Sequence, residues 1–211
     1  MNKTPQLDQW RGAFGDAYIE RNRADAARLQ VTTALWAKLL GRLAGDPPRS
    51  ILEVGANVGA NLHCIRRLTD AGLWAIEPNE RAREALVKSG VAPVSHVLDG
   101  VAQDIPMPDG SVELAFTSGV LIHIQPSDLL AACREIHRCT NKYIICNEYF
   151  ADQPEEKLYR GEAGLLFKRD FGSFWLDNFP DLVVVDCGFC WRRTTGCDNS
   201  TWWIFKKRQA A

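Results

Sequence analysis

The sequence lacks the features of several large protein classes. Its 211 residues contain no apolar run close to the ~20 residues that a membrane-spanning helix needs. Neither sign of charge is in excess, because 25 Lys and Arg face 26 Asp and Glu. A nucleic-acid-binding protein usually presents a basic face to the phosphates, so this balance argues against a nucleic-acid partner. We therefore expect neither a membrane nor a nucleic acid as the partner.

Targeting signals, internal repeats and linkers are also missing. The first ten residues are polar and have no apolar segment of the secretory type, which predicts a cytoplasmic protein. The length suffices for one sizeable core but is short for two ordinary domains. We predict one domain over residues 1–211, with an N-terminal helical cap (1–45) and a substrate-lid insertion (150–180).

The seven cysteines are an odd number spread along the chain, which is typical of reduced thiols in a cytosolic protein. Cys187 and Cys190 form a CxxC pair, a spacing used by zinc and redox sites. They lie in an apolar segment, residues 182–191, that predicts a strand. Residues three apart on a strand point to opposite faces, and no second ligand pair follows at metal spacing. We expect no metal site.

From about residue 24, the pattern predicts alternating helices and strands. We expect helices at 24–44, 61–69, 80–89 and 127–139, and strands at 50–54, 73–76, 94–98, 112–117 and 142–146. Ser127 is the expected N-cap of the last of these helices, and Gly90 the expected C-terminal residue of another. Strands at 182–191 and 201–206 leave no room for a helix between them and predict an antiparallel hairpin. The fold class is α/β, a mostly parallel seven-stranded sheet with an antiparallel C-terminal hairpin and helices on both faces.

A glycine-bearing turn follows the first strand. Gly55 and Gly59 allow the backbone to adopt positive φ and to approach a ligand closely, and the helix that follows offers free N–H groups. A dinucleotide fingerprint requires GxGxxG, but Asn57 stands where its second glycine would be and would crowd a pyrophosphate. The spacing instead favours the carboxylate and ammonium groups of a methionine-type ligand, served by Asn57, Asn61 and the backbone.

An acidic residue, Glu77, follows the second strand. An acid outside the carboxyl edge of the sheet can accept both hydroxyls of a ribose, in nicotinamide and S-adenosylmethionine (SAM) enzymes alike. The distance in sequence from Gly55 to Glu77 fits one βαβ unit. We therefore favour the ribose role for Glu77 over that of a surface loop residue.

The segment from Ile51 to Tyr149 resembles the class I SAM-dependent methyltransferases. Residues 105–114 are similar to the family's LPFPDGSFD segment, and residues 118–124 match the loop after its fourth strand. The resemblance implies a Rossmann-like fold with SAM as cofactor and S-adenosylhomocysteine (SAH) as product. The family's adenine-reading acid falls at Val101 here, with Asp99 two residues earlier. The cofactor residues expected from these motifs are Glu53, Gly55, Ala56, Asn57, Gly59, Asn61, Glu77, Pro78, Asn79, Asp99, Gly100, Val101, Ser118, Gly119 and Val120.

A second resemblance spans nearly the whole chain. Residues 10–22, 119–124, 147–149, 159–161 and 166–171 look like the methylases found with pseudaminic-acid biosynthesis. This resemblance implies a small-molecule acceptor in sugar, glycan or related metabolism.

The N-terminal segment carries candidate acceptor residues. Trp10, Phe14 and Tyr18 share a face if the segment is helical, although two glycines weaken a helix there. We assign Trp10 and Phe14 to packing, whereas Tyr18 is placed to meet the sulfonium or the substrate with its aromatic face. Arg21 is either solvated or a bidentate donor to a carboxylate.

Further candidates follow the fourth and fifth strands. His123, Glu148 and Tyr149 stand at the carboxyl ends of these strands and are the predicted catalytic residues. His123 either takes the acceptor's proton or only shapes the pocket. In the insertion, the residues Tyr159, Arg160, Lys168 and Arg169 form a basic cluster that predicts an anionic acceptor under a lid.

Two other functions stay open on the sequence. One is a SAM-binding partner protein without turnover, against which His123 and the intact insertion argue. The other is a nicotinamide-dependent oxidoreductase, against which the missing GxGxxG argues. Methylation of DNA is disfavoured, because the sequence has no Asn/Asp-Pro-Pro-aromatic motif.

Overall fold

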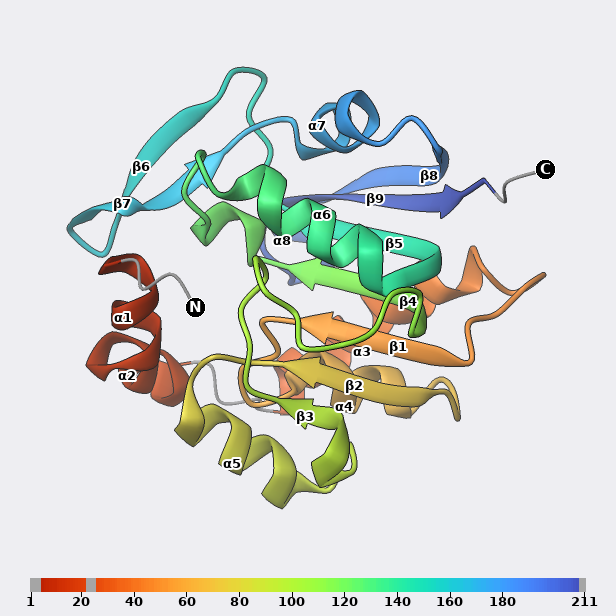
Figure 1. Cartoon of the computed structure of the whole chain (residues 1–211), viewed down its shortest axis with the longest axis horizontal. Helices are drawn as coiled ribbons and strands as arrows, with labels where there is room; N and C mark the ends of the chain where they lie inside the picture. Colours follow the sequence, from red (N-terminus) through yellow and green to blue (C-terminus); the bar gives the residue numbers. More distant parts are fainter. Residues whose placement is uncertain (1–4, 22–25, 209–211) are drawn as a thin grey trace.

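A computed structural model describes residues 5–21 and 26–208 and builds the chain around one seven-stranded sheet (Figure 1). The strand order is β3-β2-β1-β4-β5-β9-β8. The strands are β1 (Ser50–Val54), β2 (Gly72–Ile76), β3 (Val97–Leu98), β4 (Val112–Ser118), β5 (Thr140–Glu148), β8 (Leu182–Cys190) and β9 (Ser200–Lys207). Strands β1 to β5 run parallel, and β9 and β8 add an antiparallel hairpin at one edge. The predicted fold class is confirmed.

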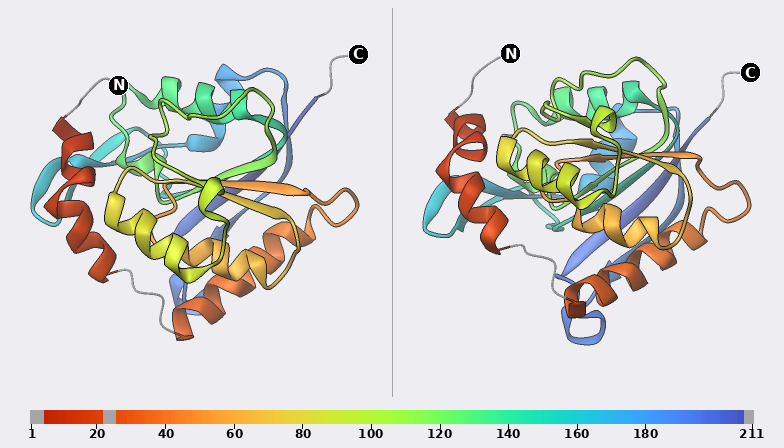
Figure 2. Two further views of the ribbon diagram at one scale, coloured as in Figure 1. Left: turned by 60° about the horizontal axis from the view of Figure 1, so that its bottom comes forward. Right: turned by 90° about the horizontal axis from the view of Figure 1, so that it is seen from below.

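Helices cover both faces of the sheet, as Figure 2 shows. One face carries α3 (Ala26–Gly41), α4 (Ala60–Arg66) and α5 (Glu80–Ser89), and the other carries α6 (Leu129–Cys139) and α7 (Phe171–Asn178). Because both faces of the sheet are buried, β1 and β4 carry consecutive apolar residues, Ile51-Leu52 and Leu114-Ala115-Phe116, instead of a strict alternation with polar ones. On the α3 face, for example, Trp36 packs on Phe116 with ring centroids 4.3 Å apart.

Two short helices stand at the edge where the parallel strands end (Figure 1). They are α1 (Pro5–Arg11) and α2 (Ala13–Arg21), separated at Gly12. The side chain of Asn79 docks them onto α5, because its Nδ2 donates to the Trp10 carbonyl at 3.2 Å and to Asp16 Oδ1 at 3.0 Å. An ion pair of 2.9 Å between Arg11 and Asp99 adds a second attachment.

The insertion after β5 forms a separate hairpin of β6 (Glu155–Tyr159) and β7 (Glu162–Lys168). Its two turn residues, Arg160 and Gly161, both have positive φ, 56° and 87°. This is the tight turn that suits the twist of a hairpin, but it favours Asn or Gly at its first position. Arg160 therefore holds a strained conformation, which costs roughly 1–2 kcal/mol for a residue with a Cβ.

Local details differ from the sequence-based expectations. Residues 94–96 form a 3₁₀ turn before a two-residue β3, so the predicted strand is mostly absent. Asp128, not Ser127, occupies the N-cap position of α6, and no side chain caps that helix. A one-turn helix, α8 (Arg192–Thr195), lies between β8 and β9, where none was expected, and ends at Gly196 in the left-handed conformation. Gly90 ends α5 in that conformation, as predicted.

Within the described part of the chain, none of the helices combines the length and the hydrophobicity that spanning a membrane requires.

Candidate active site

A cleft of about 1330 Å³ opens at the carboxyl edge of the parallel strands. It lies where the strand order reverses between β1 and β4, the usual ligand site of an open α/β sheet. Its volume exceeds the roughly 300–1,000 Å³ of a typical small-molecule pocket, so it has room for two ligands. Of the predicted cofactor residues, those lining the cleft are Glu53, Gly55, Ala56, Asn57, Asn61, Glu77, Pro78, Asn79, Gly100, Val101, Ser118, Gly119 and Val120.

The β1–α4 loop has the left-handed backbone that its glycines predict. Gly55 has a φ of 76°, and Asn57 a φ of 48°. A Cβ on Gly55 would lie 2.7 Å from Val120 Cγ2, so a larger residue would push the loop into the loop after β4. Both loops line the cleft, and their close packing holds them in place relative to each other.

The carboxylate of Glu77 is buried and anchors the neighbouring backbone. Its Oε2 accepts from the Asn57 N–H at 2.7 Å, and its Oε1 accepts from the Asn79 N–H at 2.9 Å. Burial raises the pKa of Glu77, and these two N–H donors partly offset that effect. Since each carboxylate oxygen has two lone pairs, the group can still accept hydrogen bonds from a ribose.

Glu53 is a second buried carboxylate in the cleft, 3% exposed. Its Oε1 accepts from Asn61 Nδ2 at 2.7 Å, and Asn61 Oδ1 in turn accepts from Trp36 Nε1 at 3.1 Å. Its Oε2 is buried without a hydrogen-bond partner among the described residues. Burial raises the pKa of Glu53 to about 8. A cationic ammonium group would satisfy this oxygen, and Asn61 holds the carboxylate in place for it.

Two predicted cofactor residues lie outside the cleft lining. Gly59 packs under α5, where an added Cβ would meet Leu86 Cγ at 3.0 Å. Asp99 pairs with Arg11 at 2.9 Å and with Arg83 at 3.2 Å, so its carboxylate is occupied by two guanidinium groups. Beyond Val101, the side of the cleft next to β3 is lined by Ala102, Gln103 and Asp104, which the sequence analysis did not single out.

His123 ends a 3₁₀ turn, residues 121–123, after β4. Its Nδ1 donates to the Leu165 carbonyl of β7 at 2.5 Å, which leaves Nε2 as the acceptor atom of the ring. The rings of Trp10 and Tyr159 flank it, each with its centroid 4.9 Å away. Burial lowers the pKa of His123 to about 4, so the imidazole is neutral at physiological pH.

Glu148 and Tyr149 are adjacent in sequence but occupy different environments. Glu148 is fully buried outside the cleft and accepts from the backbone N–H groups of Val120 and Leu121, both at 3.1 Å. Burial raises the pKa of Glu148 to about 7. It shapes the loop that carries His123 and has no access to a substrate. Tyr149 lines the cleft, and its hydroxyl donates to Asp198 Oδ2 at 3.3 Å.

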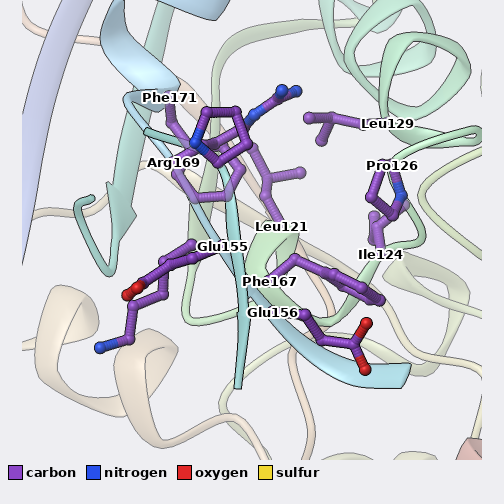
Figure 3. A pocket seen from close by; sticks show the side chains of 11 residues that line it. Leu121, Ile124, Pro126, Leu129, Glu155, Glu156, Phe167, Arg169 and Phe171 are labelled. Carbon is purple, nitrogen blue, oxygen red and sulfur yellow. The ribbon is translucent and has the colours of Figure 1, made fainter. Parts of the chain in front are cut away.

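The predicted acceptor residues are divided between two cavities. Tyr18, Tyr159 and Arg160 line the cleft. Lys168 and Arg169 instead line a smaller pocket of about 190 Å³ between the insertion and α6 (Figure 3). The two cations therefore do not join Arg160 in one cluster. The side chain of Arg21 lies outside the described residues.

Cleft residues that sequence reasoning missed come from distant segments. They are Arg28 near the start of α3, Asn147 at the end of β5, and Arg192 and Asp198 between β8 and β9. No local motif marks them, because only the folded chain brings them to one cavity.

Cys187 and Cys190 point to opposite sides of β8, since Cys187 is exposed and Cys190 is buried. Among the residues that the structure describes, no three His, Cys, Asp or Glu side chains cluster in a way that could hold a metal.

Residues 52–143 match the protein family described as "Methyltransferase domain". The match begins inside β1, at Leu52, and contains β2 to β4 and the cleft loops that follow these strands, including Glu53, Glu77 and His123. No protein of curated function matches the sequence.

Several solved structures with this fold are methyltransferases. A SAM-dependent methyltransferase from Leishmania major is 15% identical over 97% of this chain and 87% of its own, with a TM-score of 0.72. The 1,6-didemethyltoxoflavin-N1-methyltransferase of Burkholderia thailandensis, with bound 1,6-didemethyltoxoflavin and SAH, is 15% identical over 99% and 92%, with a TM-score of 0.71. Magnesium protoporphyrin IX methyltransferase of Synechocystis PCC 6803, with bound SAM, is 11% identical over 98% and 100%, with a TM-score of 0.67.

The fold is thus that of the Rossmann-like class I methyltransferases. The domain match and the cleft taken together support a methyltransferase.

Proposed function

We propose that this enzyme methylates an anionic small molecule, held between α1–α2 and the β6–β7 hairpin beside the cofactor. One observation carries the proposal: a single continuous cleft joins the loops after β1 and β2 to Tyr18, His123, Tyr159 and Arg160. Two structural neighbours are methyltransferases named for small molecules, 1,6-didemethyltoxoflavin and magnesium protoporphyrin IX. The resemblance to methylases of pseudaminic-acid biosynthesis favours a sugar or a related metabolite of glycan or secondary metabolism.

Residues of the chain fit the groups of SAM one by one. Glu53 offers an unpartnered buried oxygen to the ammonium group, and Glu77 offers its carboxylate to the ribose hydroxyls. The left-handed loop at Gly55 lets the backbone come close to the methionine part. When bound, SAM supplies a methyl group already activated by its sulfonium.

His123 acts on the acceptor. Its neutral ring offers Nε2 to an O–H or N–H of the acceptor, and the Leu165 carbonyl fixes the ring orientation. Trp10 and Tyr159 pack against the ring and reduce the access of water to it. With Tyr18 in the same aromatic group, these side chains hold the acceptor in line with the transferable methyl.

Arg160 supplies the anion recognition. Its strained backbone places an arginine at the hairpin tip, where Asn or Gly would be more stable. Strain retained at a cleft residue suggests a function that offsets its cost. A guanidinium group at this point binds a carboxylate or phosphate as a bidentate donor.

The first test is calorimetric titration of the protein with SAM, SAH and NADH. We expect micromolar binding of SAM and SAH and none of NADH; the reverse result would replace the methyltransferase with an oxidoreductase. Gly55→Val should reduce SAM affinity at least 100-fold, because its side chain would meet Val120. The control Gly90→Ala has the same positive φ but open space around it, so it should lower stability and leave SAM binding intact.

Turnover separates an enzyme from a SAM-binding partner protein. We expect SAH to form when the protein is incubated with SAM and a panel of carboxylated and phosphorylated sugars and heterocycles. Tight SAM binding without SAH formation across the panel would favour the non-catalytic partner.

A further inference from the structure

The cleft extends beyond the cofactor loops into a region that the sequence did not reveal. One side of this region is the start of α3, and the other is the connection that contains α8. Both segments lie outside residues 52–143, so the matched domain does not supply them. We call this surface the α3–α8 wall, and its cleft-lining members include Arg28, Val31, Arg192, Gly196 and Cys197.

Close packing fixes the two halves of the wall to each other. Gly196 has a φ of 76°, and an added Cβ would lie 2.9 Å from Val31 Cγ1. The Cys197 thiol donates to the Val31 carbonyl at 3.7 Å. Arg28 precedes Val31 by one helical turn, and the Arg192 carbonyl accepts from the Gly196 N–H at 2.9 Å. Both arginines are therefore within one turn of the same contact.

The wall brings both signs of charge to the cleft, with more arginine than acid. Arg28 and Arg192 both line the cleft, and no carboxylate in the described part of the chain forms an ion pair with Arg192. Arg42, farther along α3, forms an ion pair of 2.8 Å with Asp186. The acid on the α8 side, Asp198, accepts a hydrogen bond from Tyr149.

We propose that the α3–α8 wall is an anion subsite that takes a carboxylate or phosphate group through Arg28 and Arg192. The inference rests on the proposed function, since it assigns a ligand group to the same cleft. Guanidinium groups suit both anions, because their planar N–H donors match two oxygens at once. Two sources can supply the anion: the carboxylate at the methionine end of SAM, or an acidic group of the acceptor.

The test compares Arg192→Gln and Arg28→Gln with the control Arg193→Gln. Arg193 is the neighbour of Arg192 on the same turn and does not line the cleft. Each variant is titrated with SAM and with decarboxylated SAM, which lacks the carboxylate. Inorganic phosphate is then added to the SAH complex, and the rise in melting temperature is measured.

If the wall holds the cofactor, Arg192→Gln should weaken SAM at least tenfold relative to Arg193→Gln and leave decarboxylated SAM unchanged. If it holds the acceptor, SAM affinity should stay constant and the stabilisation by phosphate should be lost. Arg28→Gln should follow Arg192→Gln in either case.

The subsite is wrong if Arg192→Gln and Arg193→Gln behave alike with SAM and with phosphate. Failure of the proposed function would look different, because the unchanged protein would then bind neither SAM nor SAH. In that event the phosphate titration of the free protein still decides whether the anion subsite exists.

Discussion

The two parts of the cleft are built in different ways. The cofactor part comes from consecutive loops of the matched domain and presents the buried carboxylates Glu53 and Glu77. The acceptor part comes from the N-terminal helices, the β6–β7 hairpin and the α8 connection, and presents aromatic rings and arginines. Short-range sequence motifs thus define the cofactor part of the cleft, whereas packing between distant segments defines the acceptor part.

Among changes that test the difference between the two parts of the cleft, the largest expected effect is on turnover. His123→Ala should lower kcat by about 10²- to 10⁴-fold with any acceptor that supports SAH formation, because Nε2 no longer holds the acceptor. SAM affinity, measured by calorimetry, should hardly change. The control is His96→Ala, since His96 also bonds a backbone carbonyl through Nδ1 and stacks on an aromatic ring, but lies at the outer sheet edge. Equal kcat in the two variants would remove His123 from the mechanism.

An intermediate effect concerns the pH dependence of cofactor binding. The pKa of Glu53 is raised to about 8, so this side chain is mostly protonated at pH 7 in the free protein. A bound ammonium group favours the ionised form of Glu53, so SAM binding releases a proton from this side chain. SAM affinity should therefore rise between pH 6 and 8, by up to about tenfold per pH unit, and level off above pH 8. Glu53→Gln should abolish that slope.

A ligand control isolates the ammonium group in this experiment. Methylthioadenosine lacks the amino-acid end of SAM, so its affinity should show no such slope in either protein. If SAM keeps its pH slope in Glu53→Gln, Glu53 does not face the ammonium group.

The smallest effect is at the hairpin tip and has opposite signs for stability and for function. Arg160→Asn should raise the free energy of unfolding by about 1 kcal/mol, because Asn tolerates the left-handed conformation better. The same change should raise the KM for an anionic acceptor several-fold. Arg169→Asn, on the other side of the insertion, should leave KM unchanged. Equal KM values in the two variants would contradict anion binding by Arg160.

The sequence predicts the fold well wherever the signal is local. Strands β1 and β4 are marked by their apolar runs, and α5 by its Gly90 end. The helix α8 was missed because one turn leaves no periodicity to detect. Ser127 was expected as a cap from its residue type, whereas the chain turns into α6 one residue later.

The site is predictable only in part, because only some of its residues are marked by a local sequence signal. Glu77 follows from its distance in sequence to Gly55 within one βαβ unit, but the side of a strand that a residue faces depends on its register. Asn147 lines the cleft, and Glu148, one residue later, points into the core. Lys168 ends β7, and Arg169 follows it, so both lie at the opposite end of the hairpin from the turn that holds Arg160.

The cysteines give the molecule a built-in attachment point for a reporter group. Of the seven, all in the described part of the chain, only Cys187 on the edge strand is exposed. Burial raises the pKa values of Cys133, Cys139 and Cys146, which protects these thiols from alkylation. A maleimide dye should therefore label Cys187 first, without any cysteine being removed. Cys197, half-buried in the α3–α8 wall, should react more slowly. A ligand bound at the wall should lower the labelling rate of Cys197 further, so this rate reports whether the wall is occupied.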